Sequence, residues 1–384
     1  MKILILRTAS GKVNLNTYNL QEIGLAKALT RMGHSCDVAY FGGKEKDHWT
    51  KVSFDGNKEI QVLWLRGYAL ARGSIYPTLH KYINNYDMIQ IGGYLGIVSC
   101  LLNRKYGYKV VNYQGPYYYK NNKGDILKAA VLDRVLLPFS KKKNMICMTK
   151  SSLAEQYLRN KGLEDVTTVG VGLDADNLID ESASAKDNEF VSKISNKKEN
   201  EKYFLYIGVL EDRRNTLFLI DVFARIHNHN KDWKLIMIGR GSDDYTNAVM
   251  DKISEYGIGD SVYYEKKVEQ KYMHFVYELA DAFLLPTKYE IFGMVLLEAM
   301  YYGVPVFTTY NGGSSTLMNS ENGVVIENNQ PDFWASKIIE VVENEEMYQR
   351  ISVNGAETIK NSYTWDKLAV KFLEVYKKRL EGNK

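Results

Sequence analysis

The stretch LLPTKYEIFGMVLLEAMYYGVPV, residues 284–306, decides the fold of this chain. It opens with apolar residues that end at Pro286, as a buried strand does, and from about Phe292 its apolar residues recur at the spacing of a helix. A second apolar run follows at Val304–Thr309. The stretch therefore predicts a strand, a short loop, a helix and a second strand, which is the βαβ unit of a parallel sheet.

Two carboxylates lie in this stretch, Glu290 in the loop and Glu298 in the helix, with Gly293 at the helix start. On one continuous helix they would lie about 12 Å apart along the axis and about 80° apart around it, too far to share one proton. The N–H groups of Gly293, Met294 and Val295, together with the helix dipole, favour an anion between the carboxylates. The pair is thus predicted to hold two ends of one elongated ligand with phosphates in its middle, which is the shape of a nucleotide diphosphate-sugar.

Strands and helices alternate along the rest of the chain. The first alternation runs from Lys2 to Val169 and the second begins at Tyr203, whereas residues 181–202 are polar and charged with little to bury. This pattern predicts the α/β class, with two Rossmann-like halves of doubly wound parallel sheet joined by a linker. Open sheets of this kind bind ligands at the carboxyl ends of their strands, so a cleft between the halves is expected.

Composition supports a globular chain of about two domains, since it has 384 residues of which 45% are hydrophobic. No apolar run approaches the ~20 residues that span a bilayer, and the N-terminal residues turn polar too soon for a signal peptide. The three cysteines, Cys36, Cys100 and Cys147, lie far apart in apolar segments, which favours reduced thiols over a disulfide or zinc framework. These features predict a cytoplasmic location.

Charge is unevenly distributed along the chain. Residues 1–180 hold 25 Lys and Arg against 15 Asp and Glu, while residues 181–384 hold 25 against 31. A basic first half suggests an anionic partner, such as a membrane surface, a lipid-linked phosphate or nucleic acid; an unevenly charged but solvated surface is the alternative. The apolar helix expected at Ile126–Phe139 runs into Lys141–Lys143, which fits an interfacial helix or a core helix with a basic cap. We favour a membrane surface over nucleic acid.

Several segments of the second half resemble one known family. The run from Glu290 to Val306 resembles the donor-site signature of retaining, nucleotide-sugar-dependent glycosyltransferases of the GT-B fold (group 1, family 4-like), in which a Glu and a second Glu are separated by seven residues. YIGVLEDRRNTLFLIDVF (206–223), LIMIGRG (235–241), NGGSSTLMNSENGVVI (311–326) and YTWDKLAVKFLEVYKKRL (363–380) resemble further segments of that family.

The resemblance implies a GT-B type fold, in which two Rossmann-like domains have parallel sheets facing a central cleft. Residues 1–180 would form the acceptor domain, residues 203–362 the donor domain, and residues 363–384 a C-terminal helix that crosses back onto the first domain. Residues 181–202 would be the linker between them.

The resemblance also implies roles for single residues. Glu290 would lie at the donor sugar and act in catalysis, and Glu298 would accept hydrogen bonds from the ribose. Arg214 occupies the position of the family's diphosphate-binding Lys and would stabilise the leaving diphosphate, with Arg213 as the alternative. The donor-binding residues implied in this way are Gly208, Arg213, Gly239, Arg240, Phe292, Gly293, Met294, Val295 and Glu298.

The chain departs from the family pattern at three places. Val209 stands where a second cation is usual, so that charge would come from Arg240 or be missing. Gln114 stands where many members carry a His and cannot titrate, which indicates a front-face mechanism in which the departing phosphate takes the acceptor proton. Thr316 stands near the place of a usual Glu. On the acceptor side, Gly11 resembles part of the family's glycine loop, although a plain connecting loop is equally consistent.

Neither a metal nor a cofactor is expected. Asp174 with Asp176, and Asp243 with Asp244, have no His or Cys nearby and suit helix capping better than metal binding. The segment Gly239–Gly241 lacks the third glycine of a dinucleotide fingerprint, which argues against an oxidoreductase.

These observations predict a retaining hexosyltransferase that uses a nucleotide diphosphate-sugar, with a UDP-sugar favoured. The expected acceptor is a saccharide or lipid-linked saccharide in the biosynthesis of a bacterial surface polysaccharide such as a capsule, at the inner face of the cell membrane. A nucleotide-sugar epimerase of similar double-Rossmann build, which would need no acceptor, and a non-catalytic saccharide-binding protein, which would release no nucleotide diphosphate, are the alternatives.

Overall fold

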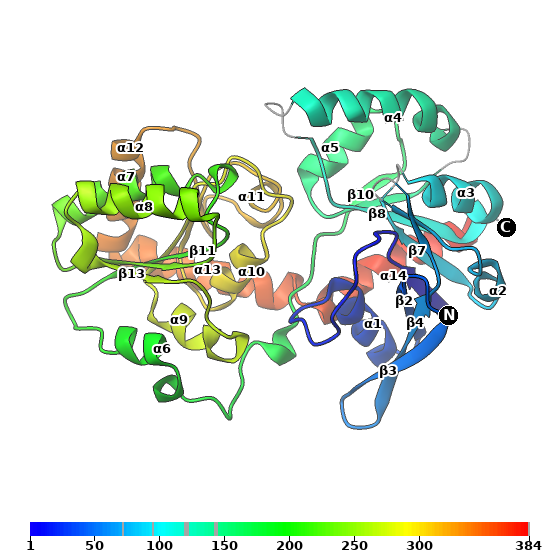
Figure 1. The fold of residues 1–384 in the computed structure, drawn as a ribbon, viewed down its shortest axis with the longest axis horizontal. Helices are drawn as coiled ribbons and strands as arrows, with labels where there is room; N and C mark the ends of the chain where they lie inside the picture. Colours follow the sequence, from blue (N-terminus) through cyan, green and yellow to red (C-terminus); the bar gives the residue numbers. More distant parts are fainter. Residues whose placement is uncertain (71–72, 94–95, 119–122, 142–144, 383–384) are drawn as a thin grey trace. The chain divides into compact units, whose positions relative to one another are not determined.

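The computed structural model describes residues 1–70, 73–93, 96–118, 123–141 and 145–382 (Figure 1). The chain forms two compact units. Unit 1 consists of Met1–Asp174 and Thr364–Lys384, and unit 2 consists of Ala175–Tyr363. Unit 2 is therefore one continuous segment, whereas unit 1 is completed by the C-terminal end of the chain.

Unit 1 contains an eight-stranded sheet in the order β10-β9-β8-β7-β1-β2-β4-β3. Only β3 is antiparallel to its neighbour in this sheet. A separate antiparallel pair is formed by β5 and β6. The strands are β1 (Lys2–Leu6), β2 (Ser35–Phe41), β3 (His48–Phe54), β4 (Lys58–Leu65), β5 (Tyr68–Leu70), β6 (Gly73–Ile75), β7 (Met88–Gly92), β8 (Val110–Gln114), β9 (Cys147–Thr149) and β10 (Val166–Thr168).

The antiparallel strand β3 departs from the purely parallel sheet expected for this half. It forms a hairpin with β4, and the turn between them places Asp55 and Gly56 at φ values of 45° and 73°. Asp-Gly is a strong signal for such a hairpin turn, because both positions need positive φ. This dipeptide could have revealed the hairpin from sequence.

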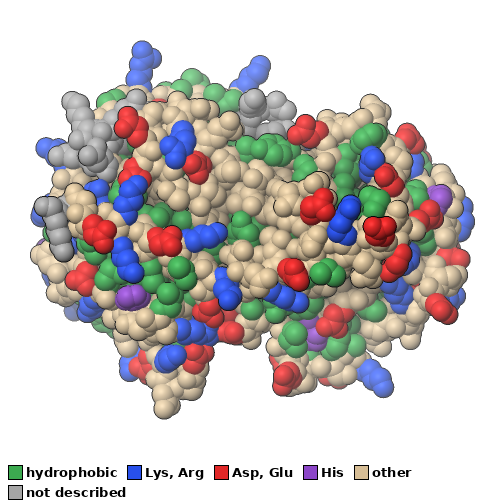
Figure 2. Space-filling model, turned by 180° about the vertical axis from the view of Figure 1, so that it is seen from behind, with side chains coloured by type: hydrophobic (Ala, Val, Ile, Leu, Met, Phe, Trp, Pro, Cys, Tyr) green, Lys and Arg blue, Asp and Glu red, His purple; other side chains and the backbone are tan. Residues whose placement is uncertain are grey.

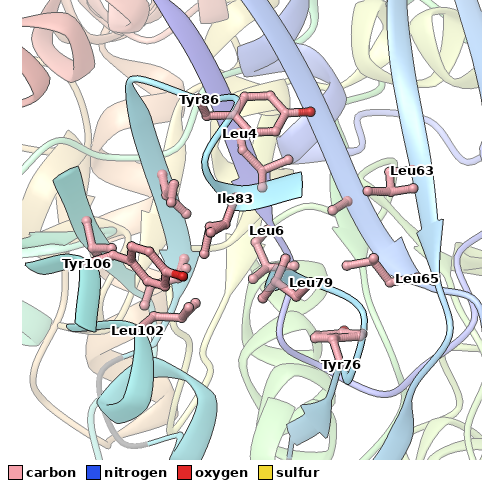
Figure 3. Packing of buried hydrophobic residues seen from close by; sticks show 14 residues of the cluster. Leu4, Leu6, Leu63, Leu65, Tyr76, Leu79, Ile83, Tyr86, Leu102 and Tyr106 are labelled. Atoms are coloured by element: carbon pink, nitrogen blue, oxygen red, sulfur yellow. The ribbon is translucent and has the colours of Figure 1, made fainter. Parts of the chain in front are cut away.

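The helices of unit 1 lie between its strands in the sequence, except for α14, which comes from the C-terminal end of the chain. They are α1 (Gln21–Arg31), α2 (His80–Ile83), α3 (Ile97–Tyr106), η1 (Gly107–Lys109), α4 (Lys123–Lys141), α5 (Ser152–Asn160) and α14 (Trp365–Glu381). Figure 3 shows the apolar cluster between the sheet and α2 and α3, where Leu4 and Leu6 of β1 face Leu79 and Ile83. Because these side chains are almost fully buried, they supply much of the free energy that holds the sheet and helices together.

The C-terminal helix α14 packs on unit 1, as the resemblance implies. Its first residue, Trp365, fills a slot in which Cβ atoms at Gly24 or Gly172 would lie 2.2 Å and 2.4 Å from the indole ring. The indole Nε1 donates to Asn19 Oδ1 at 2.9 Å. The two glycines are therefore required by the close approach of the tryptophan.

Unit 2 contains a six-stranded, fully parallel sheet in the order β13-β12-β11-β14-β15-β16. The strands are β11 (Tyr203–Ile207), β12 (Lys234–Ile238), β13 (Val262–Glu265), β14 (Ala282–Leu285), β15 (Val306–Thr308) and β16 (Val324–Val325). Strand β14 is central, with Phe283 opposite Leu205 on one side and Val306 on the other. Residues 284–306 thus form the predicted strand-loop-helix-strand unit in the middle of this sheet.

The helices of unit 2 are α6 (Glu189–Ile194), α7 (Thr216–His229), α8 (Asp243–Glu255), α9 (Met273–Leu279), α10 (Met294–Tyr301), α11 (Ser314–Leu317), α12 (Pro331–Glu343) and α13 (Glu345–Ser362). Short 3-10 turns are η2 (Ala175–Asn177), η3 (Ala185–Asp187), η4 (Asp212–Arg214), η5 (Gly259–Ser261) and η6 (Gln270–Tyr272).

Residues 181–202, predicted as a linker, fold as part of unit 2. Helix α6 forms there with Val191 and Ile194 fully buried, and the Asn188 side chain caps its first turn by accepting from the Val191 N–H at 3.0 Å. Two apolar residues three positions apart are enough to anchor one short helix, although they are too few to stand out in a polar segment. The chain passes from unit 1 to unit 2 earlier, at Asp174–Ala175.

On the face drawn in Figure 2, Lys and Arg side chains are interspersed with Asp and Glu over both units. Among the helices in the described parts of the chain, none is long and apolar enough to cross a membrane.

Candidate active site

The donor loop, which we define as residues 286–293, leaves the carboxyl end of β14 and leads into α10. Helix α10 begins at Met294 rather than at Phe292, because Gly293 has a φ of 81° and breaks the helical geometry before it. Met294 and Val295 are its first two residues, whose N–H groups have no partner within a helix. Phe292 is buried and fixes the loop to the core. The loop therefore presents backbone N–H groups at the carboxyl edge of the sheet.

The Glu290 side chain is held by this loop and by arginine. Its Oε1 accepts from the N–H of Ile291 at 2.9 Å and of Phe292 at 3.4 Å, and its Oε2 forms an ion pair with Arg214 Nη1. Arg213 Nη1 lies 3.9 Å from the same oxygen. Both arginines proposed from the sequence thus converge on Glu290.

Arg214 is the more buried of the two arginines, with 14% of its side chain exposed against 39% for Arg213. Its Nε has no hydrogen-bond partner in the described part of the chain. That Nε would lie 3.8 Å from a Cβ placed on Gly208, at the carboxyl end of β11. A buried guanidinium with an unused donor is suited to bind an anion, because phosphate oxygens can satisfy it.

Arg213 instead supports the loop. It pairs with Glu211 at 2.6 Å and donates to the Tyr289 carbonyl at 2.8 Å. The Arg213 carbonyl in turn accepts from the Lys288 N–H at 2.9 Å and from the Thr287 hydroxyl at 3.1 Å. These bonds tie the turn η4 to the donor loop, so the structure favours Arg214 as the anion-binding residue.

The glycines at the ends of β11 and β12 allow two backbone segments to touch. A Cβ on Gly239 would lie 1.8 Å from the Gly208 carbonyl oxygen, which no side chain could tolerate. The neighbouring Arg240 is exposed, and its carbonyl accepts from the Leu210 N–H at 2.8 Å. These contacts do not test whether Arg240 supplies the positive charge that is usual at the position of Val209, so that role of Arg240 stays a prediction.

Glu298 lies inside α10, and 8% of the residue is exposed. Its Oε2 accepts from the Tyr277 hydroxyl of α9 at 2.6 Å. The Tyr277 ring stacks on Tyr302 with centroids 5.3 Å apart. Burial, followed by the charge of Glu278, raises the pKa of Tyr302 and keeps it protonated. Sequence reasoning missed Tyr277, because nothing in the sequence signals a contact between two separate helices.

A turn at Gly312 and Gly313 packs flat against the donor loop. Cβ atoms there would lie 2.0 Å from the Ile291 carbonyl oxygen and 1.8 Å from that of Phe292. The Gly312 N–H donates to the Glu290 carbonyl at 3.0 Å. Asn311, which was not predicted, holds the turn by accepting from the N–H of Gly313 at 2.9 Å and of Ser314 at 3.2 Å.

Thr316, in place of the family's usual Glu, donates to the Gly312 carbonyl at 3.0 Å, and its own carbonyl accepts from Tyr363. The Thr316 hydroxyl thus supports the turn, and no carboxylate is offered to a ligand at this position.

The two residues proposed for the acceptor lie in unit 1. Gln114 ends β8, is 7% exposed, and donates through Nε2 to the Pro116 carbonyl at 2.8 Å. Gly11 lies in the exposed loop after β1, and a Cβ there would meet open space. Close packing does not therefore explain a glycine at position 11.

Lys150, which sequence reasoning missed, lies at the same edge as Gln114. It follows β9, its Nζ donates to Gln21 Oε1 at 2.7 Å, and it lies 5.2 Å from the centre of the Tyr113 ring. Burial lowers the pKa of Lys150, although the charge of Glu22 opposes this. Arg7 ends 3.8 Å from Glu22. Two cations and one carboxylate thus meet at the carboxyl edge of the unit 1 sheet.

The acidic pairs considered for a metal have other roles. Ser242 caps α8 by accepting from the Tyr245 N–H at 3.3 Å, and Asp243 and Asp244 occupy the first turn of that helix. Asp174 forms an ion pair with Lys27 at 3.7 Å. Within the described ranges no group of three or more His, Cys, Asp or Glu could hold a metal ion.

Comparison with known proteins finds one family whose model covers this site. The model of the family described as glycosyl transferases group 1 matches residues 187–358, a segment that includes the donor loop, both arginines and Glu298. An uncharacterized glycosyltransferase of Methanocaldococcus jannaschii is 29% identical over 186 residues, covering 48% of this chain and 47% of that protein. The chain thus spans about half the length of the curated relatives it matches.

Solved structures resemble the whole chain. Sucrose-phosphate synthase from Thermosynechococcus elongatus matches with a TM-score of 0.74 at 16% identity and covers 100% of both chains. HepE from Anabaena, solved in complex with UDP, matches with a TM-score of 0.73 at 15% identity and covers 98% of this chain and 100% of that one. The fold is therefore of the GT-B type that the sequence predicts.

Proposed function

Residues 187–358 belong to the glycosyl transferases group 1 family, and from this premise we propose that the chain moves a sugar from a nucleotide diphosphate-sugar to a hydroxyl acceptor with retention of anomeric configuration. The observation that carries the proposal is the buried Arg214, which Glu290 of the donor loop holds beside Gly208. A fixed cation at that point suits a reaction in which negative charge grows on a leaving diphosphate.

In the proposed reaction, the bond between the sugar and the phosphate oxygen breaks while the acceptor oxygen bonds to the same sugar carbon. Arg214 offsets the charge that develops on the diphosphate, and the N–H groups of Met294 and Val295 assist at the start of α10. Because Gln114 cannot titrate, the acceptor proton passes to the departing phosphate oxygen. Arg214 supplies positive charge that a metal would otherwise bring, so we expect transfer to continue in the presence of EDTA.

We propose a UDP-sugar, with a hexose, as the donor. HepE, which shares the fold, has been solved with UDP and with UDP-glucose. Glu298 would accept hydrogen bonds from the ribose through oxygen lone pairs that Tyr277 does not use, since an ionised carboxylate has about four acceptor sites. The second donor contact would be Glu290 at the sugar.

For the acceptor, we propose a lipid-linked saccharide used in a bacterial surface polysaccharide such as a capsule. The half-buried Lys150 and the neighbouring Arg7 support an acceptor that carries a phosphate, because two cations there are balanced by the single carboxylate of Glu22. Such a substrate would place the enzyme at the inner face of the cell membrane.

The proposal is tested by measuring release of UDP from UDP-sugars, with and without saccharide acceptors. Arg214→Gln should lower kcat by about 100-fold or more, the scale for losing one preorganised charge partner in the transition state. Glu298→Gln should instead weaken UDP binding by about tenfold or more, because hydrogen bonds to a charged group are lost.

Glu327→Gln, at an exposed loop position, is the matched control and should leave both values unchanged. A wild-type kcat in Arg214→Gln together with wild-type UDP binding in Glu298→Gln would contradict the assignment. Conversion of a UDP-sugar without any acceptor would favour an epimerase, and saccharide binding with no UDP release would favour a binding protein.

A further inference from the structure

Helices α3 and α4 of unit 1 each expose an apolar stripe edged by cations. On α4 the exposed residues Leu127, Val131, Arg134 and Val135 recur at positions i, i+4, i+7 and i+8, which lie on one helix face. The same spacing recurs on α3, where the exposed residues are Ile97, Leu101, Arg104 and Lys105. The two helices contact each other, so the stripes belong to one region of the unit.

This region concentrates the most exposed large apolar side chains in the described part of the chain. They are Val135 at 69% exposure, Leu127 at 68%, Val131 at 58% and Leu101 at 57%. Single exposed apolar residues are normal on protein surfaces, but a cluster edged by charges marks an interaction site.

The charge of the region is strongly one-sided. Helices α3 and α4 together contain six Lys and Arg but only two Asp and Glu. Of the two acids, Asp133 is buried and forms an ion pair with Lys161, next to α5. It lies about 200° around α4 from Val131, on the opposite face of the helix. The exposed stripe of α4 therefore carries cations such as Lys123 and Arg134 without this carboxylate.

We propose that α3 and α4 form a docking surface for an anionic lipid bilayer. Leu127, Val131 and Val135 would enter the boundary between headgroups and acyl chains, while Lys105 and Arg134 bind lipid phosphates. An apolar face combined with a cationic edge is the pattern of helices that lie in the membrane interface. The surface shares no residue with the candidate active site. The inference rests on the membrane location given in the proposed function and deepens it by naming the surface that makes the contact.

The test is co-sedimentation of the full chain with vesicles of phosphatidylcholine mixed with phosphatidylglycerol, compared with vesicles of phosphatidylcholine alone, without any donor. We expect the protein to pellet with the anionic vesicles and to be released as salt rises, because the Debye length shortens. The variant Leu127→Gln/Val131→Gln/Val135→Gln should bind at least about tenfold more weakly. Lys105→Gln/Arg134→Gln should lose roughly fivefold for each charge removed.

Helix α14 supplies matched controls in the same unit. Val370→Gln removes an exposed valine, at 47% exposure, and Lys367→Gln/Lys377→Gln removes two exposed cations. Both control variants should pellet like the wild type, and thermal melting of all variants should match because the altered side chains are exposed.

Wild-type protein that stays in the supernatant, binding that ignores lipid charge, or variants that bind as the wild type does would each overturn the proposal. A further outcome would also overturn it: the wild type forms a dimer by light scattering, the triple variant is monomeric, and neither binds vesicles. The surface would then be an interface between two copies of this chain. A thermal shift with UDP separates this test from the proposed function, and the triple variant should retain that shift. If the protein pellets with anionic vesicles but shows no thermal shift with UDP, the proposed UDP-sugar donor is contradicted and the membrane surface is not.

Discussion

Tyr277 fixes the orientation of Glu298 through a buried hydrogen bond of 2.6 Å. Replacing it with Phe removes the hydroxyl and leaves the ring in place. A hydrogen bond to a charged group contributes about 1.5–3 kcal/mol, so we expect Tyr277→Phe to weaken UDP binding by about tenfold or more. Isothermal titration with UDP measures this directly.

Tyr302→Phe is the matched control, because Tyr302 stacks on Tyr277 but donates to the Leu178 carbonyl instead of Glu298. It should leave UDP binding unchanged. If Tyr277 acts through Glu298, its effect should disappear in a Glu298→Gln background. Equal and additive losses would mean that Tyr277 acts on the ligand by another route.

Asp55, at the turn between β3 and β4, links the stability of unit 1 to pH. Hydrogen bonds from Arg31 hold its pKa at about 2, below the ordinary value of 3.8. Because the folded pKa is the lower one, the stabilisation is present above about pH 4 and is lost as pH falls through about 2. Asn tolerates the φ of 45° at this position, so Asp55→Asn should keep the turn.

We therefore expect the wild type to be more stable than Asp55→Asn at pH 5 and the difference to shrink steadily toward pH 2. Urea unfolding of the full chain, followed by tryptophan fluorescence at several pH values, measures it. A difference that stays constant over this range would show that the ion pair with Arg31 does not contribute.

At the scale of elements, α14 packs on unit 1 with one closely fitted residue at its start, Trp365. A methyl group added at Gly24 would overlap the Trp365 indole at 2.2 Å, and neither side can move freely because the indole is buried. Overpacking of this kind costs about 1–3 kcal/mol, so Gly24→Ala should lower the free energy of unfolding by about that amount. Urea unfolding followed by circular dichroism measures the change.

Gly11→Ala is the control for this substitution, since a Cβ there meets open space. It should leave stability within about 0.5 kcal/mol of the wild type. In a Trp365→Ala background the cost of Gly24→Ala should vanish, because the overlapping ring is gone. An unchanged cost there would place the strain elsewhere in α1.

Elements with regular patterns could be predicted from sequence, and those fixed by tertiary contacts could not. Strands β11 and β14 are uninterrupted apolar runs, and α10 follows a glycine. The donor loop between β14 and α10 could therefore be predicted. Strand β3 was missed because most of its side chains are exposed and its apolar residues do not alternate regularly. The contact between Tyr277 and Glu298 joins two helices across 21 positions, and only the packed sheet brings them together.

At the scale of the whole molecule, the two units differ in how they are closed. Unit 2 is continuous from Ala175 to Tyr363 and has its own parallel sheet, whereas unit 1 needs α14 from the far end of the chain. We therefore expect residues 175–363, produced alone, to unfold cooperatively and to retain the thermal shift with UDP, because the donor loop, Arg214 and Tyr277 all lie within that segment.

Residues 1–174 alone should behave differently. Without α14, the slot between Gly24 and Gly172 and the surface that buries Phe372 and Tyr376 would be open to water. The fragment should aggregate or melt well below the full chain, and co-expression with residues 364–384 should restore its cooperative melting. Circular dichroism and light scattering on the fragments decide this. If residues 1–174 melt as the full chain does, α14 does not close unit 1; if residues 175–363 fold but show no shift with UDP, the donor site needs more of the molecule than unit 2 provides.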